Sequence, residues 1–304
     1  MVGESLVDIV ITPDGATSEA VGGSPLNVAV GLARLGVPTF LITQIGADAH
    51  GRQVAEHVRS SGVDLKVSSV RADTVTSTAT ARLDADSSAS YGFDLTWDLR
   101  HQELPEATGL HVGSLGAFLR PGRDSVLDLA RQAAEREMFV SYDPNMRPAF
   151  VEDQAAAWSD VAELASLSRL VKVSDGDLHL LRPDEPIADL ARELLAAEET
   201  ELVIVTRGDA SSLAFSDGFD VEVAAPQVDV LDTVGAGDSF MAATLAILAE
   251  WGLVAPGTGH LAALDEDRVR TILGGAMTAA AVTCSRLGAN PPKRRELPPT
   301  WPAS

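Results

Sequence analysis

The sequence predicts a three-layer α/β/α fold, in which a mostly parallel central sheet lies between helices and a small second sheet is attached. Short apolar segments rich in Val and Ile alternate with amphipathic stretches of helical period. Two other segments alternate polar with apolar residues, which is typical of half-exposed antiparallel strands. A chain of 304 residues can bury one large core. We therefore expect a single domain over residues 1–304.

The central sheet is predicted from apolar bursts of strand length. Because parallel strands are buried on both faces, they read as nearly continuous apolar runs. The first run follows Met1 directly, as if a strand were already in progress, so we expect the native start to lie upstream of Met1. The expected strands cover residues 2–10, 40–45, 109–112, 138–142, 170–173 and 202–206.

The helices are predicted from apolar residues that recur every three to four positions. A further helix is expected after Gly23, where Ser24 would be the N-cap, Pro25 suits the first turn and Gly36 follows the end. The other expected helices cover residues 125–134, 155–167, 187–195 and 240–251.

The small sheet is expected from residues 10–21 and 76–99, where polar and apolar residues alternate. An early insertion of this kind could form a lid over the carboxyl edge of the main sheet, where open α/β folds place their ligands. The alternatives are an edge hairpin without a role, or a contact between two copies of the chain through exposed strand edges.

Composition excludes several classes of function. With 44 acidic and 23 basic residues the net charge is −21, which disfavours nucleic acid and anionic membranes as partners. Cys284 is the only cysteine, so the chain cannot form an internal disulfide or a cysteine metal cluster. No apolar run reaches the roughly 18 residues that span a membrane, and no leader pattern is present. A reducing cytoplasm is the expected location.

The chemistry is predicted at a glycine turn that opens a helix, Gly235-Ala236-Gly237-Asp238. The glycines allow successive backbone N–H groups to converge on one anion, and the helix N-terminus adds partial positive charge. Such a nest suits a phosphoryl group in transfer. Asp238 could be a simple helix cap, but a carboxylate beside bound phosphate is repelled unless it has a task. We therefore interpret Asp238 as the base that accepts a proton from an attacking hydroxyl.

A second glycine turn precedes the helix that begins near Ser24. Capping and core packing explain most of its residues, but Asn27 lies in the first turn, where its amide could bind a hydroxyl group. Gly22 and Gly23 adjoin the predicted lid strands and could serve as a hinge.

Two common nucleotide-binding patterns are absent. The only lysines are Lys66, Lys172 and Lys293, and none follows a glycine, so the chain has no P-loop of the GxxxxGK[ST] type. Neither glycine turn matches GxGxxG, which argues against a dinucleotide-dependent dehydrogenase.

Taken together, the two glycine turns resemble the two signatures of the ribokinase-type sugar kinases, the phosphofructokinase-B family. The signatures are residues 22–36 and 232–238, in the family's order and about two hundred residues apart. The resemblance covers nearly the whole chain, and its other matches favour the fructokinase-like branch: residues 3–8, 143–147, 172–174, 206–208 and 286–289.

The resemblance implies a ribokinase-like fold with a β-sheet lid that closes over a sugar, and it implies roles for individual residues. Asp238 would be the base, with Gly235, Ala236 and Gly237 as the anion hole. The sugar would bind to Asp8, Gly22, Gly23, Asn27 and Asp143, and ATP would lie along Lys172, Ser174, Thr206 and Gly208. Lid residues such as Tyr91, Phe93 and Trp97 would set the choice of sugar.

The resemblance also implies metal ions. Mg²⁺ would ride on the ATP phosphates with mostly water ligands, supported by Asp177, which stands where many relatives have a glutamate. Arg207 replaces a leucine of the usual Thr-Leu-Gly and could contact phosphate or face solvent. A monovalent cation, commonly K⁺, would sit behind the anion hole near Asp232, Val234, Thr283, Arg286 and Gly288.

The function expected from these residues is transfer of the ATP γ-phosphoryl group to a hydroxyl of a small sugar, with fructose as the first choice. The alternatives within the fold are a 2-keto-3-deoxygluconate kinase, a ribokinase and a nucleoside kinase. The alternative of another class is a sugar-binding protein without catalysis. A homodimer through the lid is also expected from its exposed strand edges.

Overall fold

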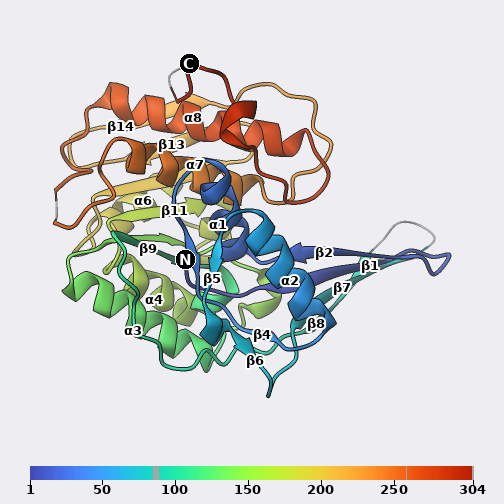
Figure 1. The fold of residues 1–304 in the computed structure, drawn as a ribbon. Coiled ribbons are helices and arrows are strands. Elements are labelled where there is room, and N and C mark those ends of the chain that lie inside the picture. The colour runs from blue at the N-terminus through green and yellow to red at the C-terminus, as the bar shows by residue number, and fades with distance from the viewer. Residues whose placement is uncertain (85–88, 258, 303–304) are drawn as a thin grey trace.

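The computed structural model describes residues 1–84, 89–257 and 259–302, and Figure 1 shows their arrangement. The main sheet has six strands in the order β14-β13-β12-β11-β10-β9. Strands β9 to β12 run parallel, while β13 and β14 add an antiparallel edge that the sequence did not predict. The strands are β9 Gly109–Gly113, β10 Phe139–Asp143, β11 Leu170–Ser174, β12 Leu202–Arg207, β13 Ser211–Phe215 and β14 Asp220–Ala224.

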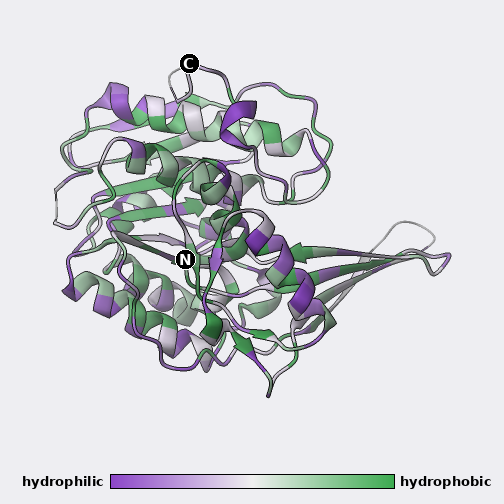
Figure 2. Ribbon diagram, viewed as in Figure 1, coloured by the Kyte–Doolittle hydropathy of each residue, from purple (hydrophilic) through white to green (hydrophobic). Residues whose placement is uncertain are grey.

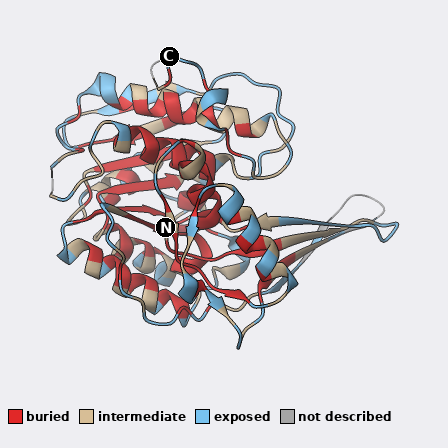
Figure 3. Cartoon of the chain, in the orientation of Figure 1, coloured by how far each residue is buried: buried red, intermediate tan, exposed pale blue. Residues whose placement is uncertain are grey.

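Alternate residues of the parallel strands enter two separate cores. Phe139 packs with Leu170 in one core, while the next residue along β10, Val140, packs in the other. Figure 3 shows these strands as the most buried part of the molecule, and Figure 2 shows hydrophobic residues concentrated on them. Burial on both faces confirms the predicted class, a mostly parallel sheet between helices.

Helices cover both faces of this sheet. One core packs the sheet against α1, α7 and α8, and the other packs it against α3, α4, α5 and α6. Five of the helices, α1, α3, α4, α6 and α7, correspond to predicted helices, and α6 has the predicted bounds. The helices are α1 Ser24–Arg34, α2 Ala49–Ser60, α3 Gly122–Glu135, α4 Gln154–Ala165, α5 Asp175–Leu181, α6 Ile187–Leu195, α7 Ala236–Glu250 and α8 Glu266–Cys284.

Two strand predictions near the N-terminus were wrong in extent. The first run divides, so that Val2 alone bridges Ile42 and Val112 beside the main sheet, whereas β1 Leu6–Ile11 belongs to the small sheet. The run at 40–45 divides into β3 Phe40–Leu41 and β4 Ile45–Gly46, which pair with β5 Asp64–Leu65 and β6 Val70–Arg71.

The small sheet extends away from the layered body in Figure 1. Its four strands follow the order β2-β1-β7-β8, with β1 and β7 parallel and the outer pairs antiparallel. Besides β1, it contains β2 Thr17–Gly22, β7 Ser77–Leu83 and β8 Ala89–Asp94.

The chain leaves the small sheet after Asp94, which changes the expectation for one aromatic residue. Trp97 is buried in the main core, and its indole N–H donates to the carbonyl of Gly116 at 3.0 Å. The sequence had suggested that Trp97 faces a ligand from the lid, and this was wrong. The side chain of Tyr91 lies outside the described part of the structure.

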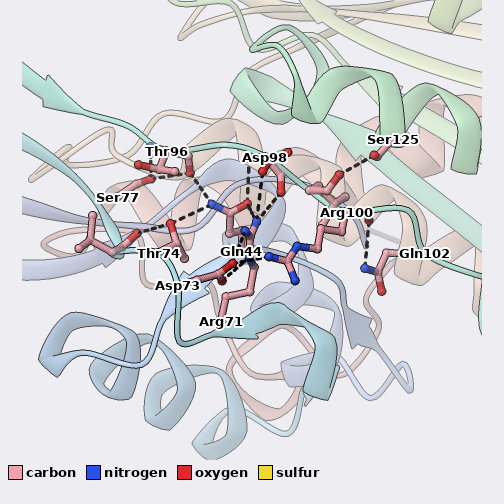
Figure 4. A network of polar contacts seen from close by, with 12 residues as sticks. Gln44, Arg71, Asp73, Thr74, Ser77, Thr96, Asp98, Arg100, Gln102 and Ser125 are labelled. Atoms are coloured by element: carbon pink, nitrogen blue, oxygen red, sulfur yellow. Dashed lines mark hydrogen bonds and ion pairs between the residues drawn. The ribbon is translucent and has the colours of Figure 1, made fainter.

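A polar network fixes the base of the small sheet to the body (Figure 4). Gln44 is only 2% exposed. Its amide N–H donates to the carbonyl of Thr96 at 3.2 Å, and its carbonyl accepts from the backbone N–H of Asp98 at 2.9 Å and from Arg71 at 3.2 Å. Arg71 also pairs with Asp73 at 3.1 Å. The network holds the segment that returns from the lid, around Thr96 and Asp98, at a defined position.

Within the described ranges, none of the helices combines the length and the apolar character needed to cross a bilayer.

Candidate active site

The two glycine motifs meet at the carboxylate of Asp238. Helix α7 begins after Gly235, whose left-handed conformation (φ 76°) turns the chain so that Asp238 lies in the first turn. One carboxylate oxygen accepts from the hydroxyl of Ser24 at 2.6 Å, and the other accepts from the amide of Asn27 at 2.8 Å. Because a carboxylate has about four acceptor positions, Asp238 can still receive a proton from a ligand.

The glycine turn presents free backbone donors beside this carboxylate. Within the described residues, no acceptor lies on the N–H groups of Gly235, Gly237 or Asp238. The N–H of Ala236, which we expected in the anion hole, instead donates to the carbonyl of Thr233 at 3.2 Å. The structure therefore offers a nest of three donors at a helix N-terminus, in which the N–H of Asp238 takes the place expected for Ala236.

A pocket of about 330 Å³ opens onto Asp238 between the lid and the carboxyl ends of the parallel strands. It brings together Asp8, Gly23 and Asn27, three of the residues predicted to bind a sugar. Its other lining residues are Glu4, Leu6, Ser24, Ala79, Phe93, Ser114, Leu115, Asn145, Arg147, Thr233, Val234, Gly235 and Gly237.

A larger cavity of about 400 Å³ lies at the opposite edge of the sheet. It is lined by Met1 and by the first residues of β9 and β10, Gly109 and Phe139, so it lies at the amino ends of the parallel strands. Ligands of open α/β sheets bind at the carboxyl ends. The smaller pocket at Asp238, where the predicted residues gather, is therefore the candidate active site.

Gly22 supports the site without lining it. A β-carbon at Gly22 would collide with the carboxylate of Asp8 on the adjacent strand. Asp8 is half-buried, and burial raises its pKa, an effect that the nearby charge of Arg147 opposes. Gly22 thus leaves room for the orientation in which Asp8 faces the pocket.

Asp143, also predicted to bind the sugar, does not line the pocket. It is buried and forms an ion pair with Lys172 at 2.9 Å. Burial raises the pKa of Asp143 to about 6, and Lys172 opposes the rise. Burial alone would lower the pKa of Lys172. The negative charges of Asp143, Asp177 and Asp238 have the larger effect, so the pKa of Lys172 is raised. The pair therefore stays ionised at neutral pH.

Lys172 lies directly beneath the glycine turn. A β-carbon built at Gly237 would lie 3.3 Å from the lysine Nζ. The ammonium group of the Lys172–Asp143 ion pair thus lies next to the three free amides, where it would help to stabilise negative charge on a phosphate.

The other predicted nucleotide residues lie on neighbouring strand ends. Ser174 and Thr206 face each other in the register of β11 and β12, and Gly208 follows β12 in a left-handed conformation. Arg207 pairs with Glu222 at 3.2 Å, so in this structure it faces the sheet edge and not a phosphate.

The segment before the glycine turn exposes its apolar side chains to solvent. Residues 225–231 form no strand, and their apolar side chains are exposed, with Val230 at 58% and Leu231 at 61%. Leu287, on the loop after α8, is also exposed, and the backbone N–H groups of Leu231 and Asp232 both donate to the carbonyl of Cys284 at the end of that helix. These two loops offer apolar surface beside the phosphate nest.

The carboxylates predicted to support metal ions are bound to protein groups. Asp177 accepts from the backbone N–H of Met146 at 2.8 Å and from Ser174 at 2.7 Å, as part of a capping box at the start of α5. In the part of the chain described here, no group of three or more His, Cys, Asp or Glu side chains is placed to hold a metal ion.

Four of the residues predicted around a monovalent cation lie on two loops that Asp232 joins, and the fifth, Thr283, lies near the end of α8. Its carboxylate accepts from the N–H of Val234 at 3.0 Å and from the N–H of Gly288 at 2.7 Å, and these bonds lower its pKa. Thr283 is buried and bonded within α8, and Arg286 pairs with Glu296 at 2.9 Å.

No role in the pocket was predicted from the sequence for Ser24, Glu4 or Arg147, all of which line it. Ser24 was expected to cap α1, but Gly23 occupies the cap position and the Ser24 hydroxyl binds Asp238 instead. Glu4 and Arg147 belong to segments that carry the family resemblance, which was the available signal, yet no role was assigned to them. Phe93 reaches from the lid to Phe150 of the body, with ring centroids 5.1 Å apart.

Glu4 makes the stability of the folded protein depend on pH. It is 6% exposed, its carboxylate accepts from the N–H of Gly116 at 2.7 Å, and burial raises its pKa to about 7. A raised carboxyl pKa means that the folded state binds the proton more tightly, so stability is lost as pH rises from about 4.5 through 7. Glu4→Gln removes this titration. We therefore expect the free energy of unfolding of the variant, relative to that of wild type, to rise by roughly 3 kcal/mol between pH 4.5 and pH 8.

Urea unfolding of both proteins across this pH range measures the effect. The exposed Glu56→Gln on α2 removes the same charge without a buried position and serves as the control. A stability difference between Glu4→Gln and wild type that did not change with pH would contradict the assignment.

Comparison with known proteins places these features in a family. The sequence profile described as "pfkB family carbohydrate kinase" matches residues 1–295. A fructokinase of Salmonella typhimurium is 33% identical over 266 residues, which are 83% of this chain and 85% of that protein.

Solved structures agree in fold. A fructokinase of Xylella fastidiosa with bound ATP superposes with a TM-score of 0.79 at 23% identity, covering 98% of this chain and 94% of that one. A fructokinase of Vibrio cholerae O395 with bound fructose, ADP and calcium ion superposes with a TM-score of 0.76 at 25% identity, covering 95% and 93%.

Proposed function

The chain belongs to the pfkB family of carbohydrate kinases, and we propose that it transfers the γ-phosphoryl group of ATP to a hydroxyl group of fructose. The observation that carries the proposal is the position of Asp238. Its carboxylate faces the pocket between Ser24 and Asn27, and three free amides and the ammonium of Lys172 lie beside it. A base and a phosphate site thus meet at one point.

The reaction follows from this arrangement. The sugar hydroxyl attacks the γ-phosphorus, its O–H proton passes to the carboxylate of Asp238, and ADP departs with the electrons of the broken P–O bond. The amides of Gly235, Gly237 and Asp238 stabilise the negative charge on the phosphoryl oxygens. Asn27 and Ser24 hold the carboxylate in place, so that little reorganisation is needed during the transfer.

Fructose is supported by the pocket and by the relatives. The pocket holds about 330 Å³, and its polar lining includes the carboxylate of Asp8 and the amide of Asn27, which suit sugar hydroxyls. The fructokinase of Salmonella typhimurium shares 33% of residues over most of both chains. Phe93 of the lid lines the pocket and contacts Phe150 of the body, and this contact would help to exclude water when a sugar is bound.

ATP would lie across the carboxyl ends of β11 and β12, near Ser174, Thr206 and Gly208, with its base against the exposed apolar residues of the two loops described above. We propose that Mg²⁺ is carried on the ATP phosphates, where it would neutralise charge, with Asp177 in the surrounding water network. A monovalent cation such as K⁺ would lie at the loops joined by Asp232, near Val234, Thr283, Arg286 and Gly288.

A contact between two copies through the lid is also proposed. The strand order leaves the outer edges of β2 and β8 without a described neighbour, and such edges can pair with a second chain.

An acceptor panel tests the proposed function. ADP release should be measured with ATP and Mg²⁺ for fructose, ribose, a nucleoside and 2-keto-3-deoxygluconate, each with and without K⁺. We expect the highest kcat/KM with fructose. Fructose binding in calorimetry without ADP release would instead support a non-catalytic sugar-binding protein.

One acceptor on this panel has an observation of its own in its favour. Arg147 lines the pocket, and its charge acts on both Glu4 and Asp8. A guanidinium group in a sugar pocket suits an acceptor that carries a carboxylate, as 2-keto-3-deoxygluconate does. A kcat/KM for that acid above the value for fructose would replace fructose as the substrate while leaving the chemistry of Asp238 unchanged.

A further inference from the structure

A second pocket, remote from Asp238, is lined by cationic side chains. It has a volume of about 520 Å³ and lies between the C-terminal ends of α1 and α2 and the segment that contains the 3₁₀ turn Arg294–Glu296. We call it the basic pocket. Its lining consists of Arg34, His57, Ser60, Ser61, Gly62, Lys293, Arg294 and Arg295.

The pocket is positively charged, whereas the chain as a whole is negatively charged. The protein carries 44 acidic and 23 basic residues, yet no acidic residue is among the eight that line the pocket. In the described chain, no carboxylate forms an ion pair with Arg34, Lys293, Arg294 or Arg295. The nearby carboxylate of Glu296 is bound to Arg286 at 2.9 Å and to the backbone N–H of Lys293 at 2.7 Å. The charge of Glu296 acts on Arg34 and Arg295, but its carboxylate pairs with neither, so the cationic groups of the pocket remain open to a ligand.

Two of the arginines are held in place by the protein. Arg34 donates to the side-chain carbonyl of Asn290 at 2.7 Å and to the backbone carbonyl of Pro291 at 2.8 Å, while its Nε is buried without a partner. Arg294 donates to the carbonyl of Trp301 at 2.7 Å and stacks on its ring. Because neutral carbonyls hold these groups, they keep their full charge in a fixed geometry, which reduces the entropy lost on binding.

The pKa of His57 reflects the positive charge around it. Burial lowers its pKa, and the charge of Arg34 lowers it further. A bound anion would reverse the second effect and raise the His57 pKa.

We propose that the basic pocket is a binding site for a small molecule that carries a diphosphate group. Arginine and lysine side chains from separate segments of the chain can each contact phosphate oxygens, and the hydroxyls of Ser60 and Ser61 provide further donors. The volume exceeds the needs of one phosphate and accommodates two. None of its lining residues lines the pocket at Asp238, so this site is separate from the active site.

The position of Arg34 links the two sites. Arg34 ends α1, whose first turn holds Asp238, and the helix of 11 residues spans about 16 Å. Its partners Asn290 and Pro291 follow Ala289, which packs against Gly235 of the phosphate nest. Occupancy of the basic pocket therefore has a short structural route to the catalytic turn.

Titration of the His57 ring by NMR tests this proposal, with inorganic pyrophosphate as the probe at constant ionic strength. His57→Gln assigns the resonance among the six histidines. We expect a saturable shift at millimolar pyrophosphate or below, and a rise in the His57 pKa of about one unit. Loss of the shift in the pocket variant described next distinguishes binding at this site from pyrophosphate bound at the active site.

Charge reversal provides the matched control. The double variant Lys293→Glu/Arg295→Glu should abolish the shift, since both side chains are exposed and can be changed without disturbing a core. Arg120→Glu/Arg131→Glu changes the net charge equally on α3 and just before it, and should leave the shift intact. The proposal is overturned if pyrophosphate leaves His57 unchanged, if the first double variant responds like wild type, or if chloride at equal ionic strength gives the same shift.

Discussion

Replacement of Asp238 by Asn should lower kcat by about 10²–10⁴-fold while fructose and ATP still bind. The substitution keeps the size of the side chain, and the amide can still form hydrogen bonds with Ser24 and Asn27, so the pocket should keep its shape. It removes the group that accepts the hydroxyl proton as the oxygen attacks phosphorus. Steady-state kinetics give kcat, and calorimetry of each ligand gives the two dissociation constants.

Asp217→Asn is the matched control for this experiment. Asp217 lies in the exposed turn between β13 and β14, so the same chemical change there should leave kcat unaltered. If Asp238→Asn turned over within tenfold of wild type, Asp238 would be a capping and orienting residue, and the base would have to be sought elsewhere in the pocket.

Gly235→Ala should cause the second large loss, about 10²–10³-fold in kcat, because it displaces the amides of the phosphate nest. Gly235 has a φ of 76°, and an added β-carbon would lie 2.7 Å from the β-carbon of Ala289. Either the turn or the loop that carries Ala289 must move, and both position the donors. The change is measured as kcat and as the affinity for ATP.

Gly252→Ala separates the loss of the nest from simple backbone strain. Gly252 follows the other end of α7 with nearly the same φ, 73°, but no atom lies within 4 Å of an added β-carbon. Each alanine should cost about 1–2 kcal/mol of stability for its left-handed conformation. Only the Gly235 variant should lose activity. Equal activity losses in both variants would show that general destabilisation, and not the nest, explains the effect.

The fold was predictable wherever one local pattern decides the structure. The bounds of the helix at Ile187–Leu195 were predicted correctly, because its apolar residues recur at helical spacing along one buried face. The buried strands β10, β11 and β12 were predicted from short, mostly apolar runs. Such segments carry their own signal and need no knowledge of their neighbours.

Other elements depend on partners that a local pattern does not reveal. The run that begins at Val2 looked like one strand, but it divides between two sheets. The residues from Val228 to Leu231 have strand-forming side chains, yet they lie exposed and form no strand, because no neighbouring strand pairs with them. Tertiary pairing decides both cases.

The chemistry proposed for the active site rests on a local sequence pattern, but only some of the residues that line the pocket could be predicted. The glycine turn at Gly235 and the acid at Asp238 together indicate an anion site with a base, because few other roles require both features. The hydrogen bond from Ser24 to Asp238 joins positions 214 residues apart. Local reasoning therefore gave Ser24 its commonest role, a helix cap. The buried pair of Asp143 and Lys172 likewise needed the fold before its place behind the nest could be seen.

The most direct test of the account is to measure the products of one reaction, wild-type protein with ATP, Mg²⁺ and fructose. Mass spectrometry should detect one phosphorylated sugar for each ADP formed, and Asp238→Asn should suppress both in parallel. ADP release without a phosphorylated sugar would mean that water is the acceptor and that the pocket at Asp238 does not present a sugar hydroxyl. That result would contradict the account.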